Sequence, residues 1–240
     1  MFCENRAARE NVRWMKVKNK LIEQLQHVMP NGMQIPKEIK MLYQYIEDNN
    51  LYVDKNGYRY GFLYPEDELK ASWTEKEREG GTRITFYPGG TENLKYWFGG
   101  GENEEVSQRL CVFAQTGGDG SESAFWISDN GELKIVHMGS GSGSMLSCVL
   151  ADNAVDFLRL LAIGYEEICW DEDFAYPPNE RPDAELIIKP NVKFRNWVTQ
   201  TFDVEIPRTA LDIVKYPACM DDESSEDEFF YWIQNFENFV

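Results

Sequence analysis

Histidine and cysteine, which carry most metal-binding and nucleophilic chemistry in proteins, are few and scattered in this sequence. The two histidines are His27, near the end of an amphipathic segment, and His137, within an apolar one. The sequence has no H-E-x-x-H, C-x-x-C or G-x-S-x-G motif, the spacings typical of zinc sites and of a nucleophilic serine. A Ser-His-Asp triad whose members lie far apart in sequence stays open at this point. We predict no metal site, no cofactor, no catalytic residue and no enzyme activity.

Two glycine-rich stretches resemble ligand-binding loops but lack the residues that would complete them. The run 139–144 reads Gly-Ser-Gly-Ser-Gly-Ser, yet Met145 follows where a phosphate-binding loop needs Lys and then Ser or Thr. A strand-like run comes next, whereas a dinucleotide-binding loop opens a helix. The stretch 117–120, Gly-Gly-Asp-Gly, lacks the further spaced ligands of a calcium loop. We interpret the first as a hairpin connection and the second as a turn whose glycines allow positive φ.

Acidic and aromatic side chains are interleaved between positions 165 and 176. Five carboxylates fall within eight residues: Glu166, Glu167, Asp171, Glu172 and Asp173. In a binding surface, the aromatic residues would supply contact area, and the carboxylates would select a cationic partner and speed its encounter. A second interpretation, a solvated loop whose aromatic residues pack on the core, stays open. A glycosidase-type carboxylate pair is disfavoured, because adjacent Asp and Glu residues are most often surface charge.

The charge of the chain excludes some classes of partner. The 240 residues include 24 basic and 41 acidic side chains, a formal net charge of −17, with 42% hydrophobic and 14% aromatic residues. Such an apolar share is too high for a disordered acidic chain. Nonspecific binding to nucleic acid or to an anionic membrane needs a basic surface, so neither partner is expected. Residues 1–40 carry eight basic and four acidic side chains, so the acidity belongs to the rest of the chain, including six acids between 221 and 228.

Targeting signals are not expected in this sequence. Its first 20 residues contain no continuous apolar stretch followed by a small-residue cleavage site, and no stretch approaches the roughly 18 apolar residues of a membrane helix. The five cysteines are odd in number and widely spaced, which disfavours a disulfide framework. We therefore predict a reduced, cytoplasmic protein.

The periodicity of apolar residues predicts a single α+β domain with an antiparallel, mainly meander sheet and helices packed against it. Apolar residues three and four apart indicate helices over 14–28, 36–48, 153–164 and 193–202. Short alternating or apolar runs, with Asn-Gly turns after two of them, indicate strands over 51–54, 58–64, 82–87, 94–98, 109–114, 123–128, 132–138 and 145–150. This order of helices, then strands, then helices is typical of an α+β domain.

The two ends of the chain are predicted to lie outside the central domain at 35–216. Residues 1–34 form an N-terminal helical extension, and residues 217–240 form an acidic segment followed by a helix. Aromatic residues at helical spacing in 229–239 allow two interpretations, a docking helix for a partner or a helix that covers the sheet. The second is favoured, because an exposed aromatic stripe would promote aggregation.

Several segments, taken in order, resemble the SUKH superfamily. The first is 113–121, Phe-Ala-Gln-Thr-Gly-Gly-Asp-Gly-Ser, followed by Ala-Phe-Trp at 124–126. Gly139 and the run 149–165, which begins Val-Leu-Ala-Asp-Asn, continue the resemblance. An Ile-Pro before the helix at 36 and the stretch 191–206 complete it, so that it covers about residues 33–215.

The resemblance implies an α+β fold and a binding function. Many bacterial members of this superfamily are immunity proteins that neutralise toxins, often nucleases or enzymes that modify nucleic acid, whereas others are regulatory or scaffolding proteins, and enzyme activity is not typical. It also implies that five residues hold the fold: Gly117, Gly118, Asp119, Gly120 and Trp126. We therefore expect an immunity protein that occludes the active site of a basic cognate toxin. A regulatory or scaffold protein of the same fold is the alternative, and a carboxylate hydrolase is a third hypothesis. The expected toxin contacts are Glu166, Glu167, Asp171, Glu172 and Asp173.

Overall fold

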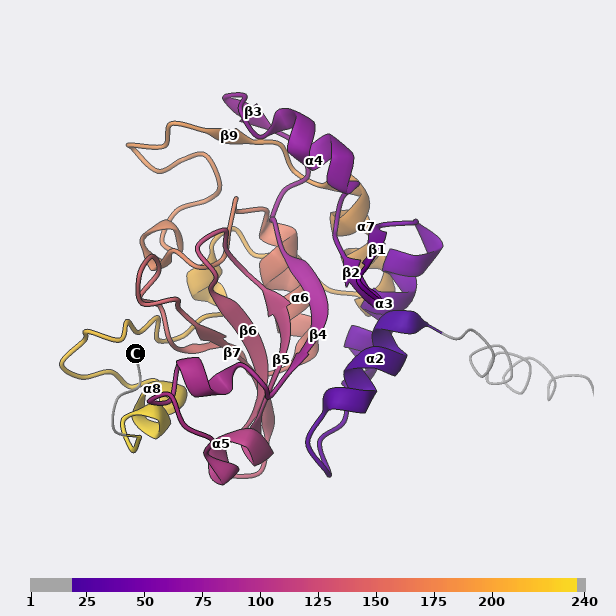
Figure 1. The fold of residues 1–240 in the computed structure, drawn as a ribbon. Helices are drawn as coiled ribbons and strands as arrows, with labels where there is room; N and C mark the ends of the chain where they lie inside the picture. The colour runs from indigo at the N-terminus through magenta and orange to yellow at the C-terminus, as the bar shows by residue number, and fades with distance from the viewer. Residues whose placement is uncertain (1–18, 237–240) are drawn as a thin grey trace, which may run out of the picture.

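An antiparallel sheet forms the centre of the structure, a computed structural model that describes residues 19–236. Seven strands pair in the order β1-β2-β4-β5-β6-β7-β8, which follows the chain apart from β3, so the sheet is a meander (Figure 1). The α+β class and the antiparallel meander expected from the sequence are confirmed. The strands are β1 (Tyr52–Lys55), β2 (Tyr58–Gly61), β4 (Thr85–Gly90), β5 (Leu110–Gln115), β6 (Glu122–Ile127), β7 (Leu133–Met138) and β8 (Val149–Ala151).

Tight turns set the register of the strands. Asn56 and Gly57 connect β1 to β2 with φ angles of 54° and 86°, the left-handed conformation that a two-residue hairpin turn needs at both positions. Gly131 has a φ of 78° in the turn between β6 and β7. With these turns in place, Tyr52 lies opposite Gly61 across the first hairpin. The local turn chemistry therefore fixes which residues of neighbouring strands meet.

Four helices cover one face of the sheet: α2 (Lys20–Val28), α3 (Lys37–Asp48), α6 (Ala154–Ile163) and α7 (Val192–Phe202). Asn19, Asn153 and Asn191 cap α2, α6 and α7, because each side chain accepts a hydrogen bond from a backbone N–H of the first helical turn. The apolar stripes of the four helices meet the sheet in the main core, where the rings of Phe113 and Phe125 stack at 4.2 Å.

Shorter elements cover the opposite face: the 3-10 helix η1 (Leu94–Tyr96), α5 (Glu104–Arg109) and α8 (Glu228–Ile233). Because side chains alternate along a strand, Val112 points to this face and Phe113 to the other. Trp126 is 1% exposed, and its ring lies 5.3 Å from Phe229 and 5.6 Å from Trp232. The described part of the C-terminal apolar stripe thus covers the sheet, the interpretation that the sequence favoured, whereas residues 237–239 of the predicted helix lie outside the described residues.

Both ends of the described chain contribute to these cores. Leu21 and Leu25 of α2 are buried in the main core, so the described part of the N-terminal segment packs as part of the domain. The start of its predicted stripe, at Trp14 and Val17, lies outside the described residues. Within residues 19–236, no helix combines the length and the apolar character needed to cross a membrane.

The segment 94–98 corrects the sequence-based prediction of a strand, because it forms η1 and the residues after it. Leu94, Trp97 and Phe98 recur at spacings of three and four, so a helical turn buries all three. The indole Nε1 of Trp97 also donates a hydrogen bond to the carbonyl of Gly139 at 2.7 Å. Packing against the face of the sheet that η1, α5 and α8 cover therefore decided between a strand and a helical turn.

Two helices that the sequence analysis did not find are α4 (Glu66–Ser72) and α5. Each is seven residues or fewer and buries one apolar side chain at most, so neither produces a periodic apolar stripe. Their signals were local: Pro65 precedes the acidic first turn of α4, and Asn103 caps α5 by accepting from the N–H of Val106. After α4, β3 (Glu77–Arg78) pairs in parallel with β9 (Ile187–Ile188), outside the main sheet.

Candidate functional site

Three loops that carry the motifs of the sequence converge at one end of the sheet. They are the turn 116–121 between β5 and β6, the loop 139–148 between β7 and β8, and the segment 164–190 that follows α6. The hydroxyl of Ser144 donates to the carbonyl of Cys169 at 2.5 Å, and the N–H of Gly118 donates to a carboxylate oxygen of Glu167 at 2.9 Å. We call this region the loop end of the sheet.

Asp119 joins the two glycine-rich stretches. Its Oδ2 accepts from the backbone N–H of Ser144 and from the hydroxyls of Ser121 and Ser140, each at 2.8 Å, and its Oδ1 accepts from the N–H of Ser121 at 3.0 Å. Burial alone would raise the pKa of Asp119, but these hydrogen bonds lower it to about 2. Asp119 thus holds the loop 139–148 against the turn 116–121, and both stretches connect neighbouring strands of the sheet, as interpreted from the sequence.

Four charged side chains form a chain of ion pairs beside this turn. Arg78 pairs with Glu166, and Nη2 of Arg83 lies 3.2 Å from Glu166 and 2.6 Å from Glu167. The second oxygen of Glu167 accepts from the indole N–H of Trp170 at 3.1 Å. Glu167 is also only 8% exposed. Two of the five predicted toxin contacts, Glu166 and Glu167, thus pair with arginines of the same chain.

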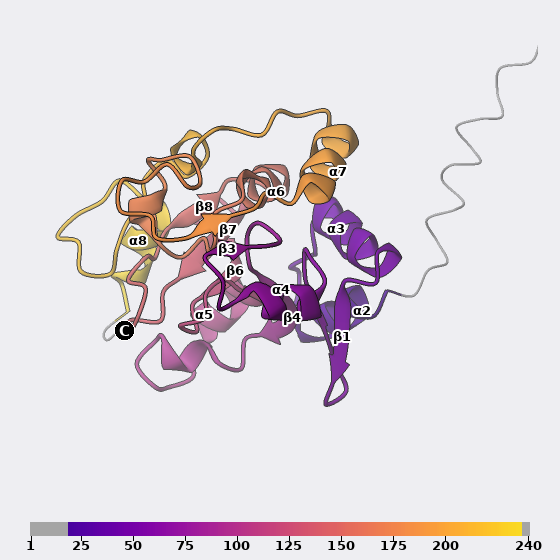
Figure 2. The same cartoon turned by 90° about the horizontal axis from the view of Figure 1, so that it is seen from above.

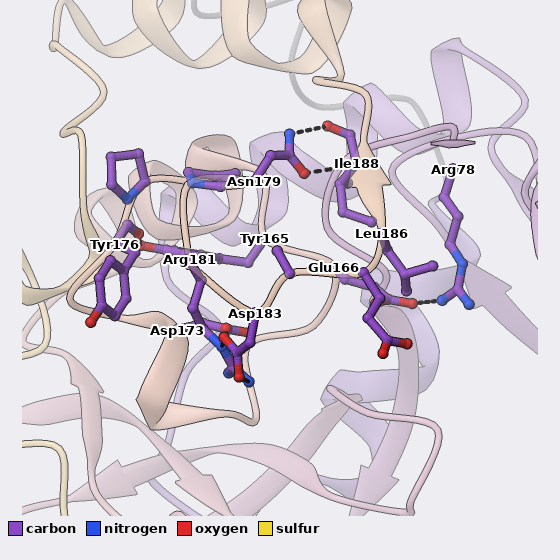
Figure 3. Close-up of a pocket in the computed structure, with 14 residues that line it drawn as sticks. Arg78, Tyr165, Glu166, Asp173, Tyr176, Asn179, Arg181, Asp183, Leu186 and Ile188 are labelled. Carbon is purple, nitrogen blue, oxygen red and sulfur yellow. Dashed lines mark hydrogen bonds and ion pairs between the residues drawn. The ribbon is translucent and has the colours of Figure 1, made fainter. Parts of the chain in front are cut away.

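A pocket of about 360 Å³ lies between the segment after α6 and β3 (Figure 3). Arg181 reaches Asp173 at 2.8 Å and Asp183 at 2.6 Å, and it lies 3.8 Å from Glu172. Asn179 closes the far side through two hydrogen bonds with the backbone of Ile188. The hydrolase hypothesis requires convergent carboxylates, one of them with a raised pKa. Here Glu166, Asp173 and Asp183 are paired with arginines, and Arg181 lowers the pKa of Asp183.

Of the remaining predicted contacts, Asp171 lies beside the C-terminal acidic segment, whereas Asp173 pairs with Arg181 in the pocket. Residues 218–220 run next to residues 145–147, where the N–H of Ser147 donates to the carbonyl of Ala218 at 2.7 Å. The thiol of Cys219 is 3.5 Å from an oxygen of Asp171, and its N–H donates to Asp222 at 2.8 Å. Figure 2 places this C-terminal loop, in yellow, next to the orange segment after α6. We define the acidic surface as Asp171, Glu172, Asp221, Asp222, Glu223 and Glu226.

The carboxylates of the acidic surface lack basic partners. Of its six residues, Glu172 alone has a cation of residues 19–236 within 4 Å, and that distance is 3.8 Å. Burial, followed by the charge and hydrogen bond of Asp171 and the charges of Asp222 and Asp221, raises the pKa of Cys219 to about 12. Glu172 is the only one of the five predicted toxin contacts that is exposed rather than partly or fully buried. The predicted contact set stays a prediction, and two of its members, Asp171 and Glu172, belong to the acidic surface.

His137 is held inside the domain by hydrogen bonds to the chain itself. His137 is fully buried, with Nδ1 2.7 Å from the carbonyl of Leu146 and Nε2 2.9 Å from the hydroxyl of Thr116. Because a carbonyl only accepts, Nδ1 carries the proton and Nε2 accepts from Thr116. Burial lowers the pKa of His137 to about 4, so the ring is neutral at pH 7. Across residues 19–236, no three His, Cys, Asp or Glu side chains are grouped as a metal site requires.

The arginines of the loop end are the residues that sequence reasoning missed. Arg78, Arg83 and Arg181 come from separate segments, and nothing local marked them as partners of the predicted carboxylates. The spacing of Arg181 and Asp183, two residues apart, was the only available signal. Comparison of the chain with family models, with curated proteins and with solved structures finds no match in any of the three.

Proposed function

We propose that this protein binds a cognate protein toxin through the acidic surface and neutralises it by occluding its active site. The observation that carries the proposal is that two acidic segments, 171–172 and 221–226, are brought together around Cys219. The six carboxylates of the acidic surface have a single, distant cation within 4 Å among the described residues. The resemblance to the SUKH superfamily supports the same function. We also propose a cytoplasmic location, which the free cysteines of the described chain support.

The charge of this surface fits a toxin that acts on nucleic acid. Such a toxin must present Lys and Arg side chains to phosphate groups, and its groove is therefore positively charged. An acidic inhibitor is steered into that groove by long-range attraction, which raises the association rate at low ionic strength. Carboxylates already paired with arginines contribute little to this attraction. For that reason the proposal rests on the unpaired carboxylates and not on Glu166 or Glu167.

The test uses the protein encoded by the neighbouring reading frame as the toxin. Cells that express this toxin should grow only when the present chain is co-expressed. The variant Glu172→Gln/Asp221→Asn/Glu223→Gln should slow association with the purified toxin by about tenfold at low salt and flatten its salt dependence. All three side chains are exposed, so folding should be unaffected.

A matched control removes the same number of charges elsewhere. Glu23→Gln/Glu102→Gln/Glu205→Gln changes three exposed carboxylates outside the acidic surface, none of which pairs with a base in residues 19–236. This variant should bind nearly as fast as the unaltered chain. A toxin that stays fully active in the presence of the chain would refute the neutralising function. Equal slowing by the two triple variants would instead show that net charge, and not this surface, guides binding.

The alternative is a regulatory or scaffold protein of the same fold without a toxin partner. A gene with no toxin-encoding neighbour, and recovery of a non-toxic partner in a pull-down, would favour it. The hydrolase hypothesis gains no support from three carboxylates of the pocket in Figure 3, because Glu166 pairs with Arg78, and Asp173 and Asp183 pair with Arg181.

A further inference from the structure

A second groove lies between α4 and the loop end of the sheet, where α4 stands near the beginning of β4 (Figure 1). It has a volume of about 200 Å³. Its walls are mostly apolar and combine side chains of α4, the start of β4 and the backbone of the turn between β5 and β6. The residues that line it include Leu69, Trp73, Arg83, Ile84, Gly118 and Glu167.

Arg83 supplies unused hydrogen-bond donors to this groove. Its Nη2 pairs with Glu166 and Glu167, whereas its Nε and Nη1 are buried and have no acceptor in the described chain. The ring of Trp73 lies 3.7 Å from the guanidinium carbon and covers its face. A buried N–H without an acceptor costs free energy, so an oxygen brought to Nε or Nη1 would be stabilised there.

Trp73 is placed so that it can move aside. It lies at the C-terminal end of α4, a helix of seven residues with no buried side chain, and its own side chain is 47% exposed. Few packing contacts hold this part of the chain, and segments with few packing contacts open locally at a low cost in free energy. The ring stacks on one face of the guanidinium group, so its displacement would open that face to the groove, which Leu69 and Ile84 also line, and would let Arg83 turn a free donor toward a ligand.

The charges around Arg83 select a neutral acceptor. The carboxylate of Glu167 lines the same groove and already compensates the guanidinium at 2.6 Å. A ligand carboxylate would meet the negative charge of Glu167 at short range, whereas a carbonyl oxygen would not. The fitting ligand is therefore an apolar group attached to an amide carbonyl, which is the chemistry of an apolar residue within a polypeptide.

We propose that this groove binds an apolar side chain of a protein partner, with the adjacent peptide carbonyl accepting a hydrogen bond from Arg83. The groove is separate from the acidic surface, so the inference goes beyond the proposed function and holds for whichever partner the acidic surface binds. It would give that partner an apolar anchor of the kind that dominates the energetics of interfaces.

The experiment titrates the full-length, isotope-labelled protein with N-acetylphenylalaninamide and follows the NMR signals of the Trp73 indole N–H and the Gly118 amide. Saturable shifts of both signals are expected. Trp73→Ala should weaken binding by about fivefold, through loss of an aromatic contact. Arg83→Lys, which keeps the positive charge but removes the free donors, should weaken it by about tenfold.

Two comparisons make the result decisive. Tyr96→Ala removes an aromatic side chain that is 65% exposed on η1, and this control should bind the probe as the unaltered protein does. N-Acetylphenylalanine, which carries a carboxylate in place of the terminal amide, should bind more weakly than the amide. Absence of saturable shifts, or equal binding by Trp73→Ala, overturns the proposal even if Arg83→Lys fails to fold. Tighter binding of the carboxylate overturns the choice of a neutral acceptor.

Discussion

Glu122 gives the sharpest test of the energetics of this fold. It lies on β6 and is 8% exposed; the hydroxyl of Tyr87 donates to its Oε1, while its Oε2 is buried without a partner in the described chain. Burial raises the pKa of Glu122 from 4.5 to about 7, against the opposing effect of the hydrogen bond from Tyr87. The folded protein therefore binds a proton at Glu122 more tightly than the unfolded chain does.

The sign and size of the effect follow from that difference. A carboxyl whose pKa is higher in the folded state contributes stability that is fully present below pH 4.5 and is lost as the pH rises through 7. One pKa unit corresponds to about 1.4 kcal/mol, so the whole contribution is about 3 kcal/mol. Most of it, about 2 to 3 kcal/mol, is lost between pH 5 and pH 8. Glu122→Gln keeps the volume of the side chain and stays neutral, so this variant should lose none of that stability as the pH rises.

The assay compares urea unfolding of the two proteins from pH 5 to pH 8. The stability of Glu122→Gln relative to the unaltered protein should rise by about 2 to 3 kcal/mol across this range. Other titrating groups, such as His137 and Asp227, cancel in this difference because both proteins contain them. Glu102→Gln, at an exposed position, should show a difference that does not vary with pH. A constant difference for Glu122→Gln as well would mean that Glu122 is hydrated, and it would refute the reasoning.

Three further substitutions test how the loop end and the outer face are held together. Asp119→Ala leaves several buried donors without their acceptor and should lower the free energy of unfolding by about 3 kcal/mol in urea; a loss below 1 kcal/mol would contradict its role as a joint between loops. Gly143→Ala places a Cβ 2.6 Å from the Cβ of Asp119 and should lower the free energy of unfolding by about 1 to 3 kcal/mol. Its control is Gly101→Ala, whose Cβ would meet no atom within 4 Å and which should leave the free energy of unfolding unchanged. Phe229→Ala should lower the free energy of unfolding by about 3 to 5 kcal/mol and lower Tm. An unchanged Tm would mean that α8 is not part of the core on the face that it shares with η1 and α5.

The elements that the sequence predicted well are those with strong local signals. Asn56 and Gly57 specify a hairpin by their own conformational preferences, and Asn153 with Gly164 marks both ends of α6. Prediction failed where local signals were ambiguous or weak. Leu94 to Phe98 suited a strand as well as a helical turn, and α4 buries no side chain that could have produced a periodic pattern.

The candidate site was predictable only in part. The acidic run at 166–173 was visible in the sequence, but its division into paired and unpaired carboxylates was not. Arg83 and Glu167 are 84 positions apart, and Asp171 and Cys219 are 48 apart. Spacing along the chain contains no signal for contacts at such separations, because they depend on how the loops close over the end of the sheet.

Composition and periodicity alone determined that the chain folds as an α+β domain with a meander sheet, and that its surface is strongly acidic. These properties depend on local backbone preferences and on side-chain counts, which do not require a tertiary structure. Only the tertiary structure decided which carboxylates face arginines, which face solvent, and that Asp119 joins two glycine-rich loops through its hydrogen bonds. The physical reason is that a charge acts through its neighbours in space, and folding chooses those neighbours.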